Sequence, residues 1–230
     1  MRHILTAIVA MAVTTVCQAR TIYVDANSTG DYPTIQAAVN DSNTGDVIIL
    51  LPRTYTGVGN RDIDSKGKSI TVQSTDPCDP AIVAATIIDC QRMGRGFVFL
   101  KGESSLLAGF TIINGRAIPF PHDEYGDAIY SKNSSPTIFN CVIKKCGGMF
   151  SIGETITCDY SNIKLIGCTI GENISIALSC FDSNAEITGC TINKNIYGTL
   201  FYGSSYVIRN TVKITDSIIT GNAIGMGCIY

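Results

Sequence analysis

One short pattern recurs along the chain and constrains its fold more than any other feature. It reads apolar, any residue, then Gly, Asn or Asp, then Cys, Phe or Ser, any residue, and Ile. The copies are L-A-G-F-T-I (107–112), I-F-N-C-V-I (138–143), L-I-G-C-T-I (165–170), I-T-G-C-T-I (187–192) and I-T-D-S-I-I (214–219). Their fourth positions are 31, 27, 22 and 27 residues apart. A strand-like motif that returns at this period is typical of a solenoid.

Two further series keep a similar period. One series places an aromatic residue or a cysteine 28, 22, 22 and 28 residues apart, at Tyr130, Cys158, Cys180, Tyr202 and Tyr230. The other places an asparagine five residues after the fourth position of its repeat, at Asn173, Asn195 and Asn222. We therefore expect at least two strands per turn, with like side chains stacked coil on coil and the asparagines forming a hydrogen-bonded ladder at one corner.

An antiparallel sandwich has no fixed long period, so the repeats favour a coil of parallel strands. Before the repeats, residues 34–39 (T-I-Q-A-A-V) predict a short amphipathic helix that covers the open end of the first coil. We assign residues 20–45 to an N-terminal strand and this capping helix, and 46–230 to the coils. The last residues, 227–230, read as the start of another coil, so we expect further C-terminal coils or another chain beyond them.

The first residues predict export. Arg2 precedes an apolar run over 4–16, and Cys17-Gln18-Ala19 offers small residues for cleavage after Ala19. An uncleaved membrane anchor is the alternative, although this run is short for a span. We therefore expect residues 1–19 to be a signal peptide, the protein to be secreted or to lie at the cell surface or in the periplasm, and no later segment to span a membrane.

Charge and cysteine content narrow the partners. The formal net charge is −2, which argues against nucleic acid as a partner. Ten cysteines occur, one of them in the predicted signal peptide. Because several fall in the repeat positions, we expect mostly free thiols buried inside the coil. Cys78 and Cys90 are the pair to test first for a disulfide bond.

The chain resembles the right-handed parallel β-helix proteins of the pectate-lyase-like superfamily, in particular exported repeat proteins grouped as carbohydrate-binding and sugar-hydrolase domains. The segments that carry the resemblance are Y-P-T-I-Q-A-A-V (32–39), G-D-V-I-I-L (45–50) and A-I-Y-S-K-N-S-S-P-T-I-F-N-C-V-I (128–143). The resemblance implies an all-β, right-handed parallel β-helix solenoid with a short N-terminal capping helix. It implies little about activity, since this scaffold hosts lyases, hydrolases, esterases and adhesins.

Candidate chemistry is sparse. The motifs of polygalacturonases (N-T-D, G-H-G, R-I-K) and of pectinesterases (Q-D-T-L, L-G-R-P-W) do not occur. One dense acidic segment, H-D-E-Y-G-D (122–127), lies between two repeats. Its carboxylates Asp123, Glu124 and Asp127 could ligate Ca²⁺. Lys132 could then act as the base of a lyase, with Arg116 and Tyr125 contacting the substrate. The competing interpretation is a solvated loop between coils.

Three functions follow from these observations. We expect first an exported β-helix that binds polysaccharide or presents it at the cell surface without catalysis. The second is a calcium-dependent polyuronate lyase that uses residues 122–132. The third is a purely structural surface or adhesin segment.

Overall fold

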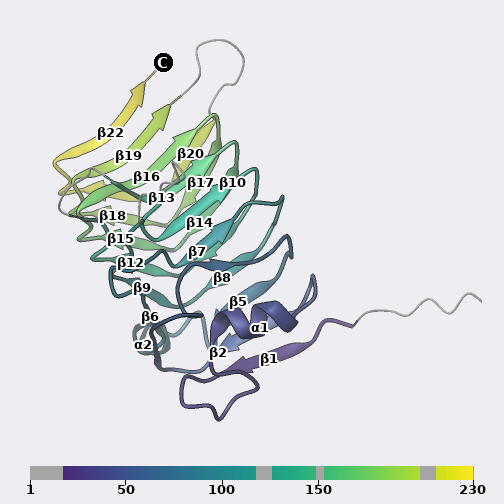
Figure 1. Cartoon of the computed structure of the whole chain (residues 1–230). Coiled ribbons are helices and arrows are strands. Elements are labelled where there is room, and N and C mark those ends of the chain that lie inside the picture. Colours follow the sequence, from purple (N-terminus) through teal and green to yellow (C-terminus); the bar gives the residue numbers. More distant parts are fainter. Residues whose placement is uncertain (1–17, 118–125, 149–152, 203–210, 230) are drawn as a thin grey trace, which may run out of the picture.

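The computed structural model describes residues 18–117, 126–148, 153–202 and 211–229, and for 228 and 229 only the backbone. In this part of the chain the strands wind repeatedly around one axis and form three parallel sheets, here named A, B and C (Figure 1). Each coil contributes one strand to sheet A, then one to sheet B, then one to sheet C. The parallel β-helix predicted from the sequence is therefore confirmed.

The strands of sheet A, in spatial order, are β1 (Thr21–Val24), β2 (Val47–Leu50), β5 (Thr71–Ser74), β8 (Leu106–Ala108), β11 (Thr137–Phe139), β14 (Asn162–Ile166), β17 (Asn184–Thr188) and β20 (Val212–Thr215). Those of sheet B are β3 (Thr54–Tyr55), β6 (Ile87–Asp89), β9 (Thr111–Ile113), β12 (Val142–Lys144), β15 (Thr169–Gly171), β18 (Thr191–Asn193) and β21 (Ile218–Thr220). Those of sheet C are β4 (Ile63–Asp64), β7 (Phe97–Phe99), β10 (Ile129–Lys132), β13 (Gly153–Asp159), β16 (Ser175–Phe181), β19 (Tyr197–Tyr202) and β22 (Ile224–Ile229).

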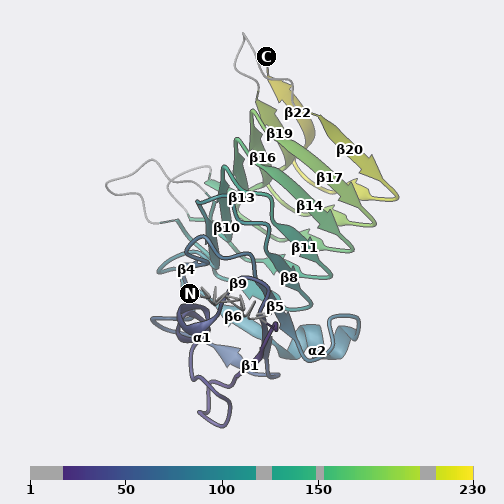
Figure 2. The same ribbon diagram turned by 90° about the vertical axis from the view of Figure 1, so that its right-hand side faces the viewer.

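Helix α1 (Ile35–Asp41) covers the end of the stack at β1, and β20 and β22 lie at the other end (Figure 2). The Thr34 side chain accepts a hydrogen bond from the Ala37 N–H and so caps the helix. Ile35, Ala38 and Val39 are buried, as the amphipathic pattern predicts. A second helix, α2 (Pro80–Ala85), was not predicted; Asp79 caps it and a proline begins it.

The recurring motif spans the corner between sheets A and B. Its third residue adopts a left-handed conformation in all five copies, with φ of 69° at Gly109, 48° at Asn140, 63° at Gly167, 62° at Gly189 and 50° at Asp216. Glycine, asparagine and aspartate tolerate this conformation best, which explains their recurrence. The next residue turns into the core, where Phe110, Cys141, Cys168 and Cys190 are at most 1% exposed.

The predicted stacking of cysteines is confirmed where it can be seen most directly. The Cys168 N–H donates to Cys190 Sγ at 3.4 Å, and Cys158 pairs with Cys180 across β13 and β16. Among the eight cysteines whose side chains the structure describes, only Cys78 is exposed. Because Cys78 lies on the surface and Cys90 in the core, the two are not joined.

Two tyrosines of the second series lie one position away from the predicted alignment. Tyr130 pairs with Thr157 rather than Cys158, and Tyr202 pairs with Phe181 rather than Cys180. Ser131 and Phe201 are the residues that pair with those two cysteines. The prediction was wrong because a shift of one residue moves a side chain to the opposite face of a strand. Tyr230, the last member of the series, lies outside the described residues.

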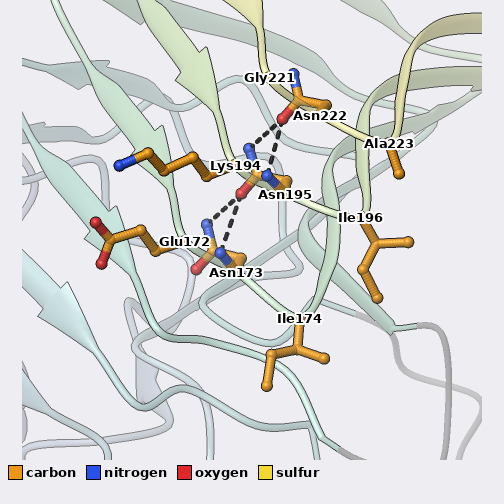
Figure 3. Close-up of a pocket in the computed structure, with 9 residues that line it drawn as sticks. All are labelled: Glu172, Asn173, Ile174, Lys194, Asn195, Ile196, Gly221, Asn222 and Ala223. Atoms are coloured by element: carbon orange, nitrogen blue, oxygen red, sulfur yellow. Dashed lines mark hydrogen bonds between the residues drawn. The ribbon is translucent and has the colours of Figure 1, made fainter.

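The predicted asparagine ladder forms at the corner between sheets B and C (Figure 3). Nδ2 of Asn173 donates to Oδ1 of Asn195 at 2.9 Å, and Nδ2 of Asn195 donates to Oδ1 of Asn222 at 3.0 Å. A serine ladder, which was not predicted, runs along the corner between sheets C and A. There the Ser134 N–H donates to Ser161 Oγ at 3.2 Å, and the Ser161 N–H donates to Ser183 Oγ at 2.9 Å.

No helix in the described residues is long and apolar enough to cross a bilayer. The predicted signal peptide, 1–19, lies almost entirely outside these residues and stays a prediction.

Candidate functional site

The residues proposed for calcium and substrate binding are only partly described. Asp123, Glu124 and Tyr125 lie outside the described residues. Arg116, Asp127 and Lys132 are described, and they surround β10 on the outward side of sheet C.

Lys132 lies at the carboxyl end of β10 and points outward. Its Nζ lies 3.2 Å from Asp159 Oδ2 on the neighbouring coil, and both side chains are partly exposed. Asp127 lies at the other end of the strand, just before Ile129. Lys132 and Asp127 are therefore not brought together in the way the lyase hypothesis requires.

Asp127 is a buried carboxyl group, 4% exposed. Its Oδ1 accepts a hydrogen bond from the Ala117 N–H at 2.8 Å, whereas its Oδ2 has no hydrogen-bond partner in the described part of the chain. Burial raises the pKa of Asp127 above its ordinary value, against the Ala117 hydrogen bond and the positive charges of Arg95, Arg116 and Arg92, which lower it. The structure thus brings Arg116 and Asp127 together, as a common site requires.

Two glycine segments make room for this group. A Cβ at Gly148 would lie 3.0 Å from Arg116 Nε, and a Cβ at Gly153 would lie 2.6 Å from Asp127 Oδ2. Arg92 reaches the same glycine segment, because its Nη1 donates to the Gly147 carbonyl at 2.9 Å. Side chains from three successive coils therefore meet at the amino end of β10 and β13.

Glu154 belongs to this cluster, although sequence reasoning missed it. It is 7% exposed and accepts a hydrogen bond from Thr157 Oγ1 at 3.1 Å. Burial raises the pKa of Glu154, and the nearby Asp127 charge acts in the same direction, while the Thr157 hydrogen bond opposes both. Glu154 follows Asp127 by 27 residues, one period of the repeat, and that spacing could have identified it.

A row of exposed side chains continues from Lys132 along the axis of the stack. Lys132 pairs with Asp159, Asp159 with Phe181, and Phe181 with Tyr202 on successive strands. The rings of Phe181 and Tyr202 stack with centroids 4.4 Å apart and an interplanar angle of 7°. Tyr160, directly after Asp159, is 52% exposed, and its N–H donates to the Phe181 carbonyl at 3.1 Å. We name Lys132, Asp159, Tyr160, Phe181 and Tyr202 the outer row.

Comparison with known proteins identifies the architecture. The family model described as a right-handed β-helix region matches residues 82–230, which is more than half of the chain. This chain belongs to that family.

The hand of the coil in this β-helix protein is thereby settled as the sequence predicted. No curated protein matches it. A solved structure, a mutant of the PL6 family alginate lyase AlyGC, is similar over 98% of this chain at 11% identity and a TM-score of 0.42. This β-helix spans 39% of the length of that chain.

The fit of Ca²⁺ to the described residues of the β-helix is poor. Guanidinium groups surround Asp127, and positive charges at short range repel a cation. No group of three or more potential ligands occurs among the residues that the structure describes. Ligation by Asp123 and Glu124 stays a prediction.

An open groove of the β-helix runs beside the asparagine ladder, between the side chains of Ile174, Ile196 and Ala223 (Figure 3). The amides of the ladder already bond to one another and to backbone groups. Asn195 Nδ2, for example, also donates to the Ile170 carbonyl at 3.0 Å. The ladder therefore holds the coils together and offers few free groups to a ligand.

Proposed function

We propose that this β-helix is an exported protein that binds polysaccharide along the outward face of sheet C. The observation that carries the proposal is the outer row, in which charged and aromatic side chains of successive coils line up along the axis. Aromatic rings stack on the apolar faces of sugars, and charged groups bond to their hydroxyls. A site that repeats from coil to coil suits a ligand that repeats from sugar to sugar.

Other outward faces offer less to a sugar. On sheet A, Lys164, Glu186 and Lys213 satisfy one another, with Nζ–Oε distances of 3.0 and 3.8 Å. The predicted signal peptide supports the proposal further, because an exported protein meets the polysaccharides of cell surfaces.

The test removes the aromatic rings of the outer row. Phe181→Ala and Tyr202→Ala should each weaken binding by about tenfold, as expected for the loss of a contact worth ~1.4 kcal/mol. Binding of the purified chain to a panel of neutral and acidic polysaccharides is measured by affinity electrophoresis. Ile174→Ala, which removes an exposed apolar side chain from the opposite end of the β16 coil, is the matched control and should leave binding unchanged. Unaltered binding by both aromatic variants would refute the proposal.

The same samples distinguish binding from cleavage. A polyuronate lyase would produce an unsaturated product with ultraviolet absorbance, and chelator or Lys132→Ala would abolish it. Because Lys132 and Asp127 occupy opposite ends of β10, we expect binding without turnover. A chain that binds no polysaccharide would favour the structural role.

A further inference from the structure

At the amino ends of the same strands, the structure holds a second group of polar side chains that the outer row does not use. It consists of Arg92, Arg95 and Arg116 around Asp127. The three arginines come from the segments before β7 and β10, one coil apart, and their charges act on one carboxyl group.

We infer that this cluster is a subsite for an acidic sugar, in which the guanidinium groups take the anionic substituent and Asp127 Oδ2 bonds to a neighbouring hydroxyl. The inference rests on the proposed function and deepens it, because it names polysaccharides with carboxylate or sulfate groups as the ligand class.

The arginines provide the anion-binding part of the subsite. A guanidinium group presents five N–H donors in a plane that matches carboxylate and sulfate oxygens. Arg92 is exposed and Arg116 half-buried, so both can be reached by a polymer lying on sheet C, whereas Arg95 is buried behind them. Arg92 uses Nη1 to bond the Gly147 carbonyl, which orients its guanidinium group over the glycine segment.

The carboxyl group provides the second, independent indication of a ligand. A buried polar atom without a partner is costly, and such atoms in folded proteins call for an explanation. Asp127 is 96% buried by the 4% exposure of its side chain and backbone, yet its Oδ2 bonds to nothing in the described part of the chain. Gly153 leaves open the space in front of this oxygen, because a Cβ there would come within 2.6 Å of it.

The local backbone is also held in an unusual conformation. Gln91 and Arg92 are consecutive non-glycine residues with φ of 57° each, a region that costs about 1–3 kcal/mol per residue. The chain is fixed there by the Arg92 N–H, which donates to the Asn114 carbonyl at 2.7 Å. Such strain is typical of places where side chains are held ready for a ligand.

The experiment compares three probes on the full chain: polygalacturonate for carboxylate, dextran sulfate for sulfate, and dextran as the neutral polymer. Arg92→Gln and Arg116→Gln should each weaken binding of the acidic probes by about ten- to a hundredfold and leave dextran binding unchanged. Asp127→Asn, which preserves the shape of the side chain, should weaken the acidic probes as well. Lys164→Gln removes one positive charge from sheet A and should have little effect.

The outcomes separate this inference from the proposed function. Equal losses in Lys164→Gln and the arginine variants would show only a general charge effect and would overturn the subsite. Binding of dextran as tight as that of the acidic probes, unaltered in both arginine variants, would also overturn it while leaving the outer row intact. Unaltered binding in Phe181→Ala and Tyr202→Ala would overturn the proposed function instead. Thermal unfolding of each variant shows that the folded chain is being compared, and two separate arginines keep the test decisive if one variant fails to fold.

Discussion

Glu103 is 1% exposed and lies at the corner between β7 and β8, far from any outward face. Its two oxygens accept hydrogen bonds from the N–H groups of Lys101 and Gly67 at 2.6 and 2.9 Å, and from the hydroxyls of Ser65 and Ser134 at 2.9 and 2.7 Å. Burial alone would raise the pKa of Glu103, but these hydrogen bonds outweigh it and lower the pKa to about 2. One carboxylate thus joins three successive coils.

Glu103→Gln should lower the free energy of unfolding at pH 7 by roughly 1–3 kcal/mol, because the amide cannot accept all four hydrogen bonds. The native pKa lies below the unfolded value of 4.5, so the stability that Glu103 supplies is complete above pH 4.5 and is lost as the pH falls toward 2. Urea denaturation between pH 7 and pH 2 measures both effects.

The matched control for this prediction is Glu186→Gln, which removes a partly exposed carboxylate of sheet A. It should cost less than about 1 kcal/mol, as surface ion pairs usually do. An identical pH dependence of stability in the wild type and Glu103→Gln would contradict the role assigned to this residue.

At the scale of elements, the three corners of each coil obey one rule. A residue in the left-handed conformation comes first, and the side chain of the next residue accepts the N–H of its counterpart on the preceding coil. The left-handed residues are Gly167 and Gly189 before the cysteine stack, Glu172 and Lys194 before the asparagine ladder, and Asn133, Tyr160 and Asp182 before the serine ladder. Backbone groups that a turn would leave unpaired are satisfied between coils in this way.

Asn195→Ala removes the middle rung of the asparagine ladder. The N–H and Nδ2 of Asn173 both lose Oδ1 of Asn195, their acceptor, in a buried place, so the free energy of unfolding should fall by roughly 2–3 kcal/mol. Asn184→Ala is the control, since Asn184 bonds Asn162 at 2.7 Å on the exposed surface, and it should cost less than about 1 kcal/mol. Chemical denaturation of both variants decides the question, and equal losses would mean that the ladder is ornamental.

At the scale of the whole molecule, each coil covers the inward side chains of its neighbour. The aliphatic side chains Ile143, Ile170 and Ile192 stack on three successive strands of sheet B and are fully buried. In the last described coil, Ile214 and Met226, which pair with inward residues of the coil before, are 36% and 57% exposed. Burial of the core is therefore a property of the stack and not of a single coil.

Ile192→Asp should abolish cooperative unfolding or lower the melting temperature drastically, because a carboxylate would be buried without a partner in the middle of the stack. Ile218→Asp, at a position that is 60% exposed on the next strand of sheet B, should be tolerated. Circular dichroism melts compare the two variants. A cooperative, wild-type melt of Ile192→Asp would show that the assigned inward face is wrong.

The repeat motif predicted its corner well and its neighbouring strand less well. At the corner, the left-handed third residue leaves a narrow choice of amino acids, so Gly167 and Gly189 mark the position unambiguously. In sheet C no such constraint exists, and Tyr130 and Tyr202 were aligned one residue away from their true partners. Of the candidate site, the sequence singled out Arg116, and it also proposed Asp127, but as a calcium ligand.

By itself the sequence determined the coil, its period, the N-terminal cap and the inward face at each repeat, because those depend on local conformation and on spacing along the chain. Only the tertiary structure decided which polar side chains meet. Arg92, Asp127 and Glu154 lie in three different coils, and their proximity depends on how each intervening loop returns the chain to the stack. Whether Lys132 joined them depended on the strand between, which holds it at the far end and beside Asp159.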